Sequence, residues 1–117
     1  MAEFRAAVRR RDGAAVVDLH GQIDRAAAGP LAAAYDQAAA QTPGAIVLNF
    51  EGIDYINSTG IALIVGLLAR ARKEHRAVRA FGLSEHYREI FAITRLSDFM
   101  GIYPDEDSAV TATAAAS

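Results

Sequence analysis

Hydrophobic and polar side chains alternate in two short segments near the start of the chain. In residues 4–8 and again in residues 15–19, every second position is hydrophobic. A period of two indicates half-buried β-strands. Asp12 and Gly13 lie between the segments and suit a two-residue turn, because both positions tolerate positive φ angles. The chain is therefore predicted to begin with an antiparallel hairpin.

The hydrophobic spacing then changes to that of a helix followed by a buried strand. Gly29 and Pro30 suit the start of the helix, because a proline in the first turn loses no hydrogen bond. Residues 45–48 are continuously hydrophobic and include two β-branched side chains, which is typical of a strand covered on both faces. The predicted buried face of the helix consists of Leu31, Ala34, Tyr35 and Ala38.

The same reasoning assigns the rest of the chain. The predicted elements are a loop (51–57), a helix (58–73), a central strand (77–81), a short helix after Ser84, an edge strand (101–103) and a weak helix or frayed end from Ser108. Alternation of strands and helices implies right-handed crossovers and parallel pairing. We therefore predict an α/β fold with a mixed, mostly parallel sheet, an antiparallel N-terminal edge hairpin and helices packed mainly on one face.

Length and composition fit one compact domain. The chain has 117 residues, of which 52% are hydrophobic and 22% are charged, and its formal net charge is −2. We predict a single domain over residues 1–117, with its core at about 4–112 and a frayed tail at 113–117. The small net charge argues against nucleic acid as the main partner, because neutralising phosphates needs a basic surplus.

Further classes of function are excluded by what the sequence lacks. The chain has no cysteine, so a disulfide, a thiol nucleophile or a cysteine-bound zinc ion is impossible. The longest hydrophobic stretch, residues 61–69, has nine residues, whereas a membrane span needs about 20. Residues 1–11 lack the apolar run of a signal peptide. We therefore expect no membrane insertion and a cytoplasmic location.

The most informative segment is residues 57–60, between the buried strand and the strongly hydrophobic second helix. Either Asn57 or Ser58 can cap this helix, because each side chain can accept a hydrogen bond from a free N–H of the first turn. Free N–H groups and the positive end of the helix dipole favour an anion there. The Ser58 hydroxyl could thus receive a phosphate without breaking the helix. The alternative is that Ser58 is only a cap.

The second helix is hydrophobic on all sides, which is typical of a helix that is fully buried or partly reserved for a partner. We predict that Leu63, Gly66 and Leu67 form an exposed patch beside Ser58 that binds a partner. The alternative is that the first helix covers them. The stripe predicted to face the sheet consists of Ile61, Ile64, Val65 and Leu68.

Other polar residues carry weaker signals. Asp24, Glu51 and Asp54 could form a catalytic pair or a magnesium site, but their places near strand ends are equally typical of solvated loops. The three histidines fall on separate predicted elements without ligand spacing. We expect no catalysis, no metal and no cofactor. A run of basic residues could be a solvated face or could help to bind an acidic partner. It consists of Arg70, Arg72, Lys73 and Arg76.

Four segments in order resemble the signatures of one known family. They are residues 21–24, 46–50, 56–61 and 90–96, and the resemblance extends from about Phe4 to Ala112. The chain resembles the STAS domain in its stand-alone form, the anti-sigma factor antagonists. This resemblance implies the mixed sheet predicted above.

The resemblance also implies a partner-switching mechanism. In this family, an anti-sigma factor that is also a GHKL-type serine kinase phosphorylates the serine that matches Ser58. The unphosphorylated protein binds the anti-sigma factor and frees the sigma factor, and a PP2C-type phosphatase removes the phosphate. The implied partner-binding residues are Asp24, Asn57, Ser58, Thr59, Gly60, Leu63, Gly66 and Leu67.

The sequence departs from the family at Asn57, where an aspartate is usual, and at Thr59, where a second serine is frequent. Asparagine keeps the capping oxygen but removes a like charge beside a phosphate. A kinase that recognises the carboxylate would lose this contact. The alternative function is a STAS scaffold or a transport-complex subunit that binds its partner without a phosphorylation switch. The sequence does not name the sigma factor or the inducing signal.

Overall fold

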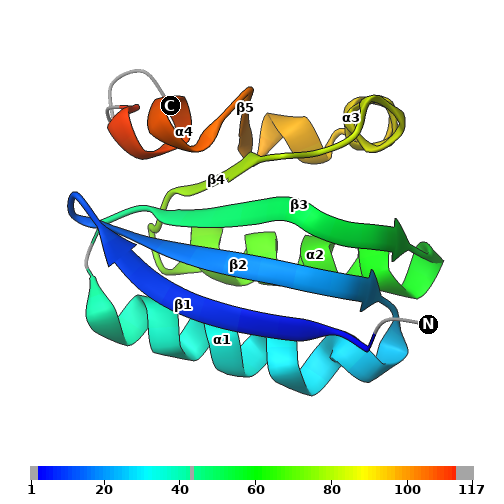
Figure 1. Ribbon diagram of the computed structural model, residues 1–117, viewed down its shortest axis with the longest axis horizontal. Helices are drawn as coiled ribbons and strands as arrows, with labels where there is room; N and C mark the ends of the chain where they lie inside the picture. Colours follow the sequence, from blue (N-terminus) through cyan, green and yellow to red (C-terminus); the bar gives the residue numbers. More distant parts are fainter. Residues whose placement is uncertain (1–2, 43, 113–117) are drawn as a thin grey trace.

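The computed structural model describes residues 3–42 and 44–112 as five strands and four α-helices. The predicted frayed tail at residues 113–117 lies outside the described residues. Two short 3-10 helices, η1 (Arg25–Ala27) and η2 (Leu96–Asp98), complete the order of elements (Figure 1). The strands are β1 (Arg5–Arg11), β2 (Ala14–Ile23), β3 (Ile46–Ile56), β4 (Val78–Phe81) and β5 (Gly101–Tyr103). The α-helices are α1 (Ala28–Gln41), α2 (Ser58–Lys73), α3 (Glu85–Ile93) and α4 (Glu106–Thr111).

The five strands form one sheet in the order β1-β2-β3-β4-β5. Strands β1 and β2 are antiparallel, and the other three pairs are parallel. Asp12 and Gly13 connect β1 to β2 with φ angles of 50° and 83°. Positive φ at both positions is what a tight hairpin turn requires. The predicted hairpin and the mostly parallel sheet are thus confirmed.

Helices α1 and α2 lie beside each other along one face of the sheet (Figure 1). The predicted buried face of α1 is confirmed, since Leu31, Ala34, Tyr35 and Ala38 are all buried. These side chains pack with the hydrophobic side of β2, β3 and β4 and with α2 and α3 in the main core. The main core therefore lies on the α1–α2 face of the sheet.

Helix α4 covers part of the opposite face of the sheet. Its Ala109 and Val110 pack in a second, smaller cluster of buried residues, the α4 cluster. The helix begins at Glu106 and is capped by Asp105, so the predicted start at Ser108 is two residues late. The other members of the α4 cluster are Ala14, Val16, Val47 and Phe81.

The loop predicted at residues 51–57 is wrong, because β3 continues to Ile56. Its second half pairs with β2 alone, through pairs such as His20 with Gly52 and Ile23 with Ile56, whereas β4 pairs only with residues 46–49. Two register irregularities in the pairing of β2 with β3 accompany this extension, each with one extra residue in β3. Because the second half of β3 has a neighbouring strand on one side only, several of its side chains are exposed and polar. This polar pattern is what suggested a loop.

Candidate functional site

The predicted functional segment lies where β2 and β3 end at the same edge of the sheet. Strand β3 leads directly into Asn57, whose backbone N–H donates to the carbonyl oxygen of Ile23 at 3.2 Å. Helix α2 then starts at Ser58, as predicted. The start of α2 is thus fixed to the last residue of β2.

Asn57 is the cap of α2. Its backbone is extended, with φ −88° and ψ −178°, and its Oδ1 accepts from the N–H of Gly60 at 2.8 Å. Its carbonyl oxygen accepts from the N–H of Ile61 at 2.9 Å. This is the bonding pattern of an N-cap. Of the two candidate caps, Asn57 holds this place, so the Ser58 hydroxyl is left for other chemistry.

Ser58 and Thr59 are both exposed in the first turn of α2. Within residues 3–42 and 44–112, no acceptor pairs with their backbone N–H groups, and the first turn has no acidic side chain. Free N–H groups at the positive end of a helix dipole attract anions. The site can therefore hold a phosphate on Ser58 without a carboxylate of the first turn to repel it.

Gly60 is buried against the end of β2. A Cβ atom at this position would collide with the carbonyl group of Ile23 and with the side chain of Ile56. Only glycine lets the first turn of α2 approach the sheet so closely. Gly60 therefore supports the site from beneath and has no exposed side of its own.

Tyr87 of α3 also supports the site, and the sequence did not reveal this. Its hydroxyl accepts from the backbone N–H of Ile56 at 2.8 Å and lies 3.4 Å from the Ile56 carbonyl oxygen, to which it donates. The Tyr87 side chain is buried. A sequence pattern can indicate that an aromatic ring is buried, but it gives no signal for the bonds of its hydroxyl, which here holds the residue just before the cap of α2.

Asp24 lies at the same edge of the sheet. It follows Ile23 and caps η1 by accepting from the N–H of Ala26 at 3.0 Å. The short helix η1 contacts α2. The structure thus brings Asp24 to the edge that carries Asn57 and Ser58, with its carboxylate half-exposed.

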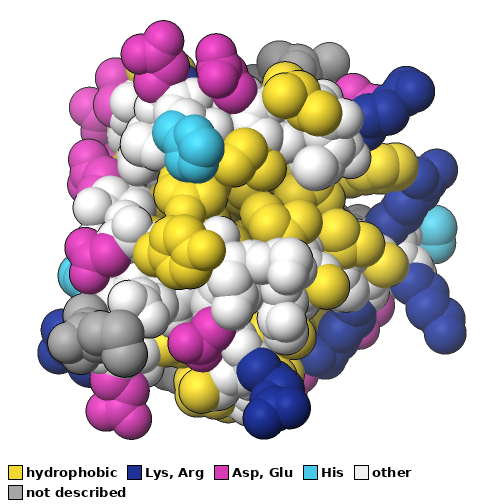
Figure 2. Space-filling model, turned by 90° about the vertical axis from the view of Figure 1, so that its right-hand side faces the viewer, with side chains coloured by type: hydrophobic (Ala, Val, Ile, Leu, Met, Phe, Trp, Pro, Cys, Tyr) yellow, Lys and Arg dark blue, Asp and Glu magenta, His cyan; other side chains and the backbone are white. Residues whose placement is uncertain are grey.

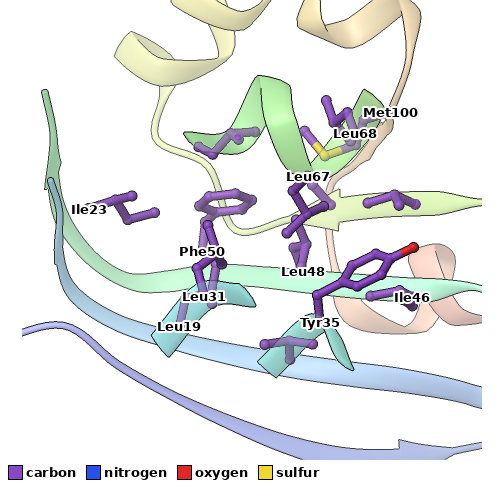
Figure 3. Close-up of a cluster of buried hydrophobic side chains, with 14 of the residues drawn as sticks. Leu19, Ile23, Leu31, Tyr35, Ile46, Leu48, Phe50, Leu67, Leu68 and Met100 are labelled. Atoms are coloured by element: carbon purple, nitrogen blue, oxygen red, sulfur yellow. The ribbon is translucent and has the colours of Figure 1, made fainter. Parts of the chain in front are cut away.

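The predicted patch on α2 is only partly exposed. Gly66 is exposed and Leu63 is half-buried, but Leu67 is only 8% exposed. The prediction that Leu67 lies on the surface is wrong. Figure 3 shows Leu67 in the same buried cluster as Tyr35 and Leu48. Helix α1 covers Leu67, which was the alternative left open.

The predicted sheet-facing stripe of α2 is wrong at one position. Val65 is 46% exposed, because α2 is buried toward both the sheet and α1. A shallow groove of about 210 Å³ remains between α1 and α2, and Leu63 and Gly66 line it. The observed buried stripe consists of Gly60, Ile64, Leu67, Leu68 and Ala71.

Figure 2 views the molecule from the edge that carries the start of α2. Hydrophobic side chains form a band across this face, with acidic side chains mainly on one side and basic ones mainly on the other. In the described part of the chain, no three His, Cys, Asp or Glu side chains gather as metal ligands would. Nor does any described helix have the length and hydrophobicity to cross a membrane.

Comparison with known proteins agrees with this geometry. A family model described as "Mlab, STAS domain" matches residues 6–102. An anti-sigma-B factor antagonist of Staphylococcus aureus is 33% identical over 57 residues, which are 49% of this chain and 53% of that protein. The chain thus spans about half the length of this relative.

Two mycobacterial proteins are similar over nearly the whole chain. The anti-sigma-F factor antagonist RsfA of Mycobacterium tuberculosis is 25% identical over 112 residues, which are 94% of this chain and 88% of that protein. A crystal structure of an anti-sigma factor antagonist from Mycobacterium paratuberculosis has a TM-score of 0.78 and 25% identity, and the match covers 93% of this chain and 92% of the other. Because the family model also covers most of the chain, this protein belongs to the STAS domain family.

Proposed function

We propose that this protein is a cytoplasmic anti-sigma factor antagonist whose partner binding is switched by phosphorylation of Ser58. The observation that carries the proposal is the exposed Ser58 hydroxyl at a helix start with free N–H groups and no acidic side chain in the first turn. The relatives named as anti-sigma factor antagonists support the same role. The protein itself is a regulator and not an enzyme.

The proposed partner of the unphosphorylated form is an anti-sigma factor that is also a GHKL-type serine kinase. The Ser58 oxygen attacks the γ-phosphorus of ATP, its proton passes to a base of the kinase, and ADP leaves. A PP2C-type phosphatase hydrolyses the phosphoserine and restores the hydroxyl. Binding to the anti-sigma factor frees the sigma factor, and phosphorylation reverses this.

The phosphate acts locally at the interface. The free N–H groups of Ser58 and Thr59 and the helix dipole stabilise its two negative charges, so the free domain need not rearrange. A partner that packs beside Leu63 and Asp24, however, must desolvate the phosphate. A loss of about 3 kcal/mol of binding free energy weakens affinity more than a hundredfold, which suffices for a switch.

The test combines the cognate kinase, ATP and peptide mass spectrometry. We expect one phosphate, on Ser58, and none in Ser58→Ala. Ser58→Ala should bind the anti-sigma factor as tightly as the wild type, whereas Ser58→Asp should bind it weakly. Thr59→Ala is the matched control and should still be phosphorylated. A label on Thr59 alone, or on no hydroxyl, contradicts the proposal.

Asn57 favours a second candidate function, a STAS scaffold or transport-complex subunit that works without phosphorylation. A neutral amide stands where this family usually has a carboxylate, and in this structure its oxygen serves as the cap of α2. Pull-down from the native lysate separates the two functions. A kinase recovered together with a sigma factor supports the switch. Membrane-transport components that bind Ser58→Asp and wild type equally well support the scaffold.

A further inference from the structure

A hydrophobic hollow lies between α2 and the connection from α3 to η2, away from Ser58. Four large hydrophobic side chains are exposed in the described part of the chain, and two of them, Val65 (46%) and Phe99 (53%), line this hollow. A third, Ile93 (80%), directly precedes Thr94, which also lines it. The hollow has a volume of about 300 Å³. We call it the α2–η2 groove, and its lining residues include Val65, Ala69, Arg72, Thr94, Leu96 and Phe99.

The α2–η2 groove continues into a larger hollow of about 790 Å³ toward the end of α2. The two hollows share Leu68, Arg72 and Phe99. The part of α2 that borders them, from Val65 to Lys73, rises about 12 Å, so a partner helix of at least two turns fits alongside. The dimensions thus suit a short helix better than a single side chain.

The charge of the groove is positive. The Arg72 guanidinium lies over the Phe99 ring, 5.3 Å from its centroid, and no described carboxylate is within 4.0 Å of it. Arg76 also lines the second hollow, but its guanidinium is already used, because it donates to the carbonyl oxygens of Thr42 at 2.6 Å and Gly44 at 3.3 Å. Asp98, the acidic residue that lines the second hollow, already accepts from Arg95 at 2.9 Å. The charge of Arg72 is therefore left to face a partner.

We propose that the α2–η2 groove is a docking surface for an acidic amphipathic helix of a protein partner. The hydrophobic ridge of such a helix fills the space between Val65 and Phe99, and a flanking carboxylate approaches Arg72. In the view of Figure 2, hydrophobic side chains lie next to basic ones along one margin of the face. Val65 lies seven residues beyond Ser58, about 10 Å along α2, so the groove is separate from the Ser58 hydroxyl.

A second copy of this chain is the poorer occupant. The first turn of α4 carries two carboxylates, but Glu106 and Asp107 are already bound by Arg9 and Arg11. The helix is also only six residues long. The groove therefore fits a helix from a different protein.

Two synthetic helical peptides with the same leucine stripe test the proposal, one flanked by glutamates and one by lysines. Each peptide is titrated separately into the full-length ¹⁵N-labelled protein, and changes in the amide chemical shifts are measured. We expect the glutamate peptide to shift amides of residues 65–72 and 94–99 and to bind at least about tenfold more tightly than the lysine peptide. Equal binding of both peptides, or no binding of the glutamate peptide at millimolar concentration, overturns the proposal.

Surface variants identify the residues that act. Arg72→Glu should reverse the preference between the two peptides. Phe99→Ser should weaken binding of the glutamate peptide at least about tenfold. Tyr55→Ser, at another exposed hydrophobic position (53%), is the matched control and should bind like the wild type. Unchanged melting temperatures show that the variants fold. Self-association that Phe99→Ser abolishes would assign the groove to a second copy and overturn the proposal.

Discussion

The two faces of the sheet hold their helices with different side chains. On one face, α1 and α2 bury large hydrophobic residues such as Tyr35, Ile64 and Leu67 in the main core. On the other face, α4 contributes only Ala109 and Val110 to the α4 cluster. Its remaining contacts include ion pairs at the surface, from Glu106 and Asp107 to arginines of β1.

The difference shows which face determines folding. Burying a large hydrophobic side chain contributes about 1.5–3 kcal/mol, whereas an exposed ion pair contributes about 0–1 kcal/mol. Helix α4 therefore opens at a lower free energy than the rest of the domain unfolds. Changes on the α1–α2 face should lower global stability, and changes at α4 should act locally and depend on salt and pH.

The largest expected effect is that of Leu67→Arg, which places a charge between α1 and α2. We expect a loss of at least about 3 kcal/mol in the free energy of unfolding, because the site is buried and has no counter-charge. Urea and thermal denaturation measure this. Val65→Arg, on the exposed side of the same helix, is the control and should change stability by less than about 0.5 kcal/mol. Equal effects would mean that α2 is rotated differently.

A smaller loss is expected where α2 meets the end of β2. Gly60→Ala places a Cβ atom against the Ile23 carbonyl group and should cost about 1–3 kcal/mol. Gly66→Ala in the same helix meets no atom within 4 Å and should stabilise by about 0.5–1 kcal/mol. Urea denaturation compares the two variants. If Gly60→Ala did not destabilise the protein, the close approach of α2 to β2 would be contradicted.

On the opposite face, Val110→Ala should cost only about 1–2 kcal/mol, and the cost should be confined to α4. Amide hydrogen exchange measures it. The amides of α4 should exchange faster, while those of β2 and β3 keep their protection. Faster exchange throughout the sheet would show that the α4 cluster is part of one cooperative unit with the main core.

The smallest effect concerns the ion pairs of Glu106. Hydrogen bonds from Arg9 lower the pKa of the Glu106 carboxyl from 4.5 to about 2 in the folded protein. A group with a lowered folded-state pKa stabilises the fold above its unfolded pKa, so this contribution is lost as pH falls from about 4.5 to about 2. Exchange of the α4 amides should therefore accelerate over this range. Glu106→Gln should remove most of this pH dependence, and high salt should weaken the ion pairs at neutral pH.

The sequence predicted most of the fold and the centre of the site because those features are local. Helix α2 begins and ends where its cap and apolar run indicate, and Asn57 is one of the two predicted caps. The orientation of α2 was not predictable in this way. A helix that is hydrophobic all round allows several buried stripes, and only the position of α1 selects the one that includes Leu67 and leaves Val65 exposed.

Long-range contacts explain the other differences. The extension of β3 to Ile56 depends on pairing with β2, which the polar pattern of residues 51–54 does not reveal. The hydrogen bonds of the Tyr87 hydroxyl to Ile56 join residues 31 positions apart. Apolar periodicity identifies the buried ring but gives no information about its polar end.

The strand order of the sheet has a consequence for how the chain can be synthesised. Each strand pairs with the strand made just before it, so no strand waits for a gap to be filled later. The sheet can therefore grow at one edge as residues leave the ribosome, with little exposed edge at risk of aggregation. The ion pairs between Arg9 and Glu106 span 97 positions and form last. Helix α4 would then dock only after all five strands of the sheet have paired.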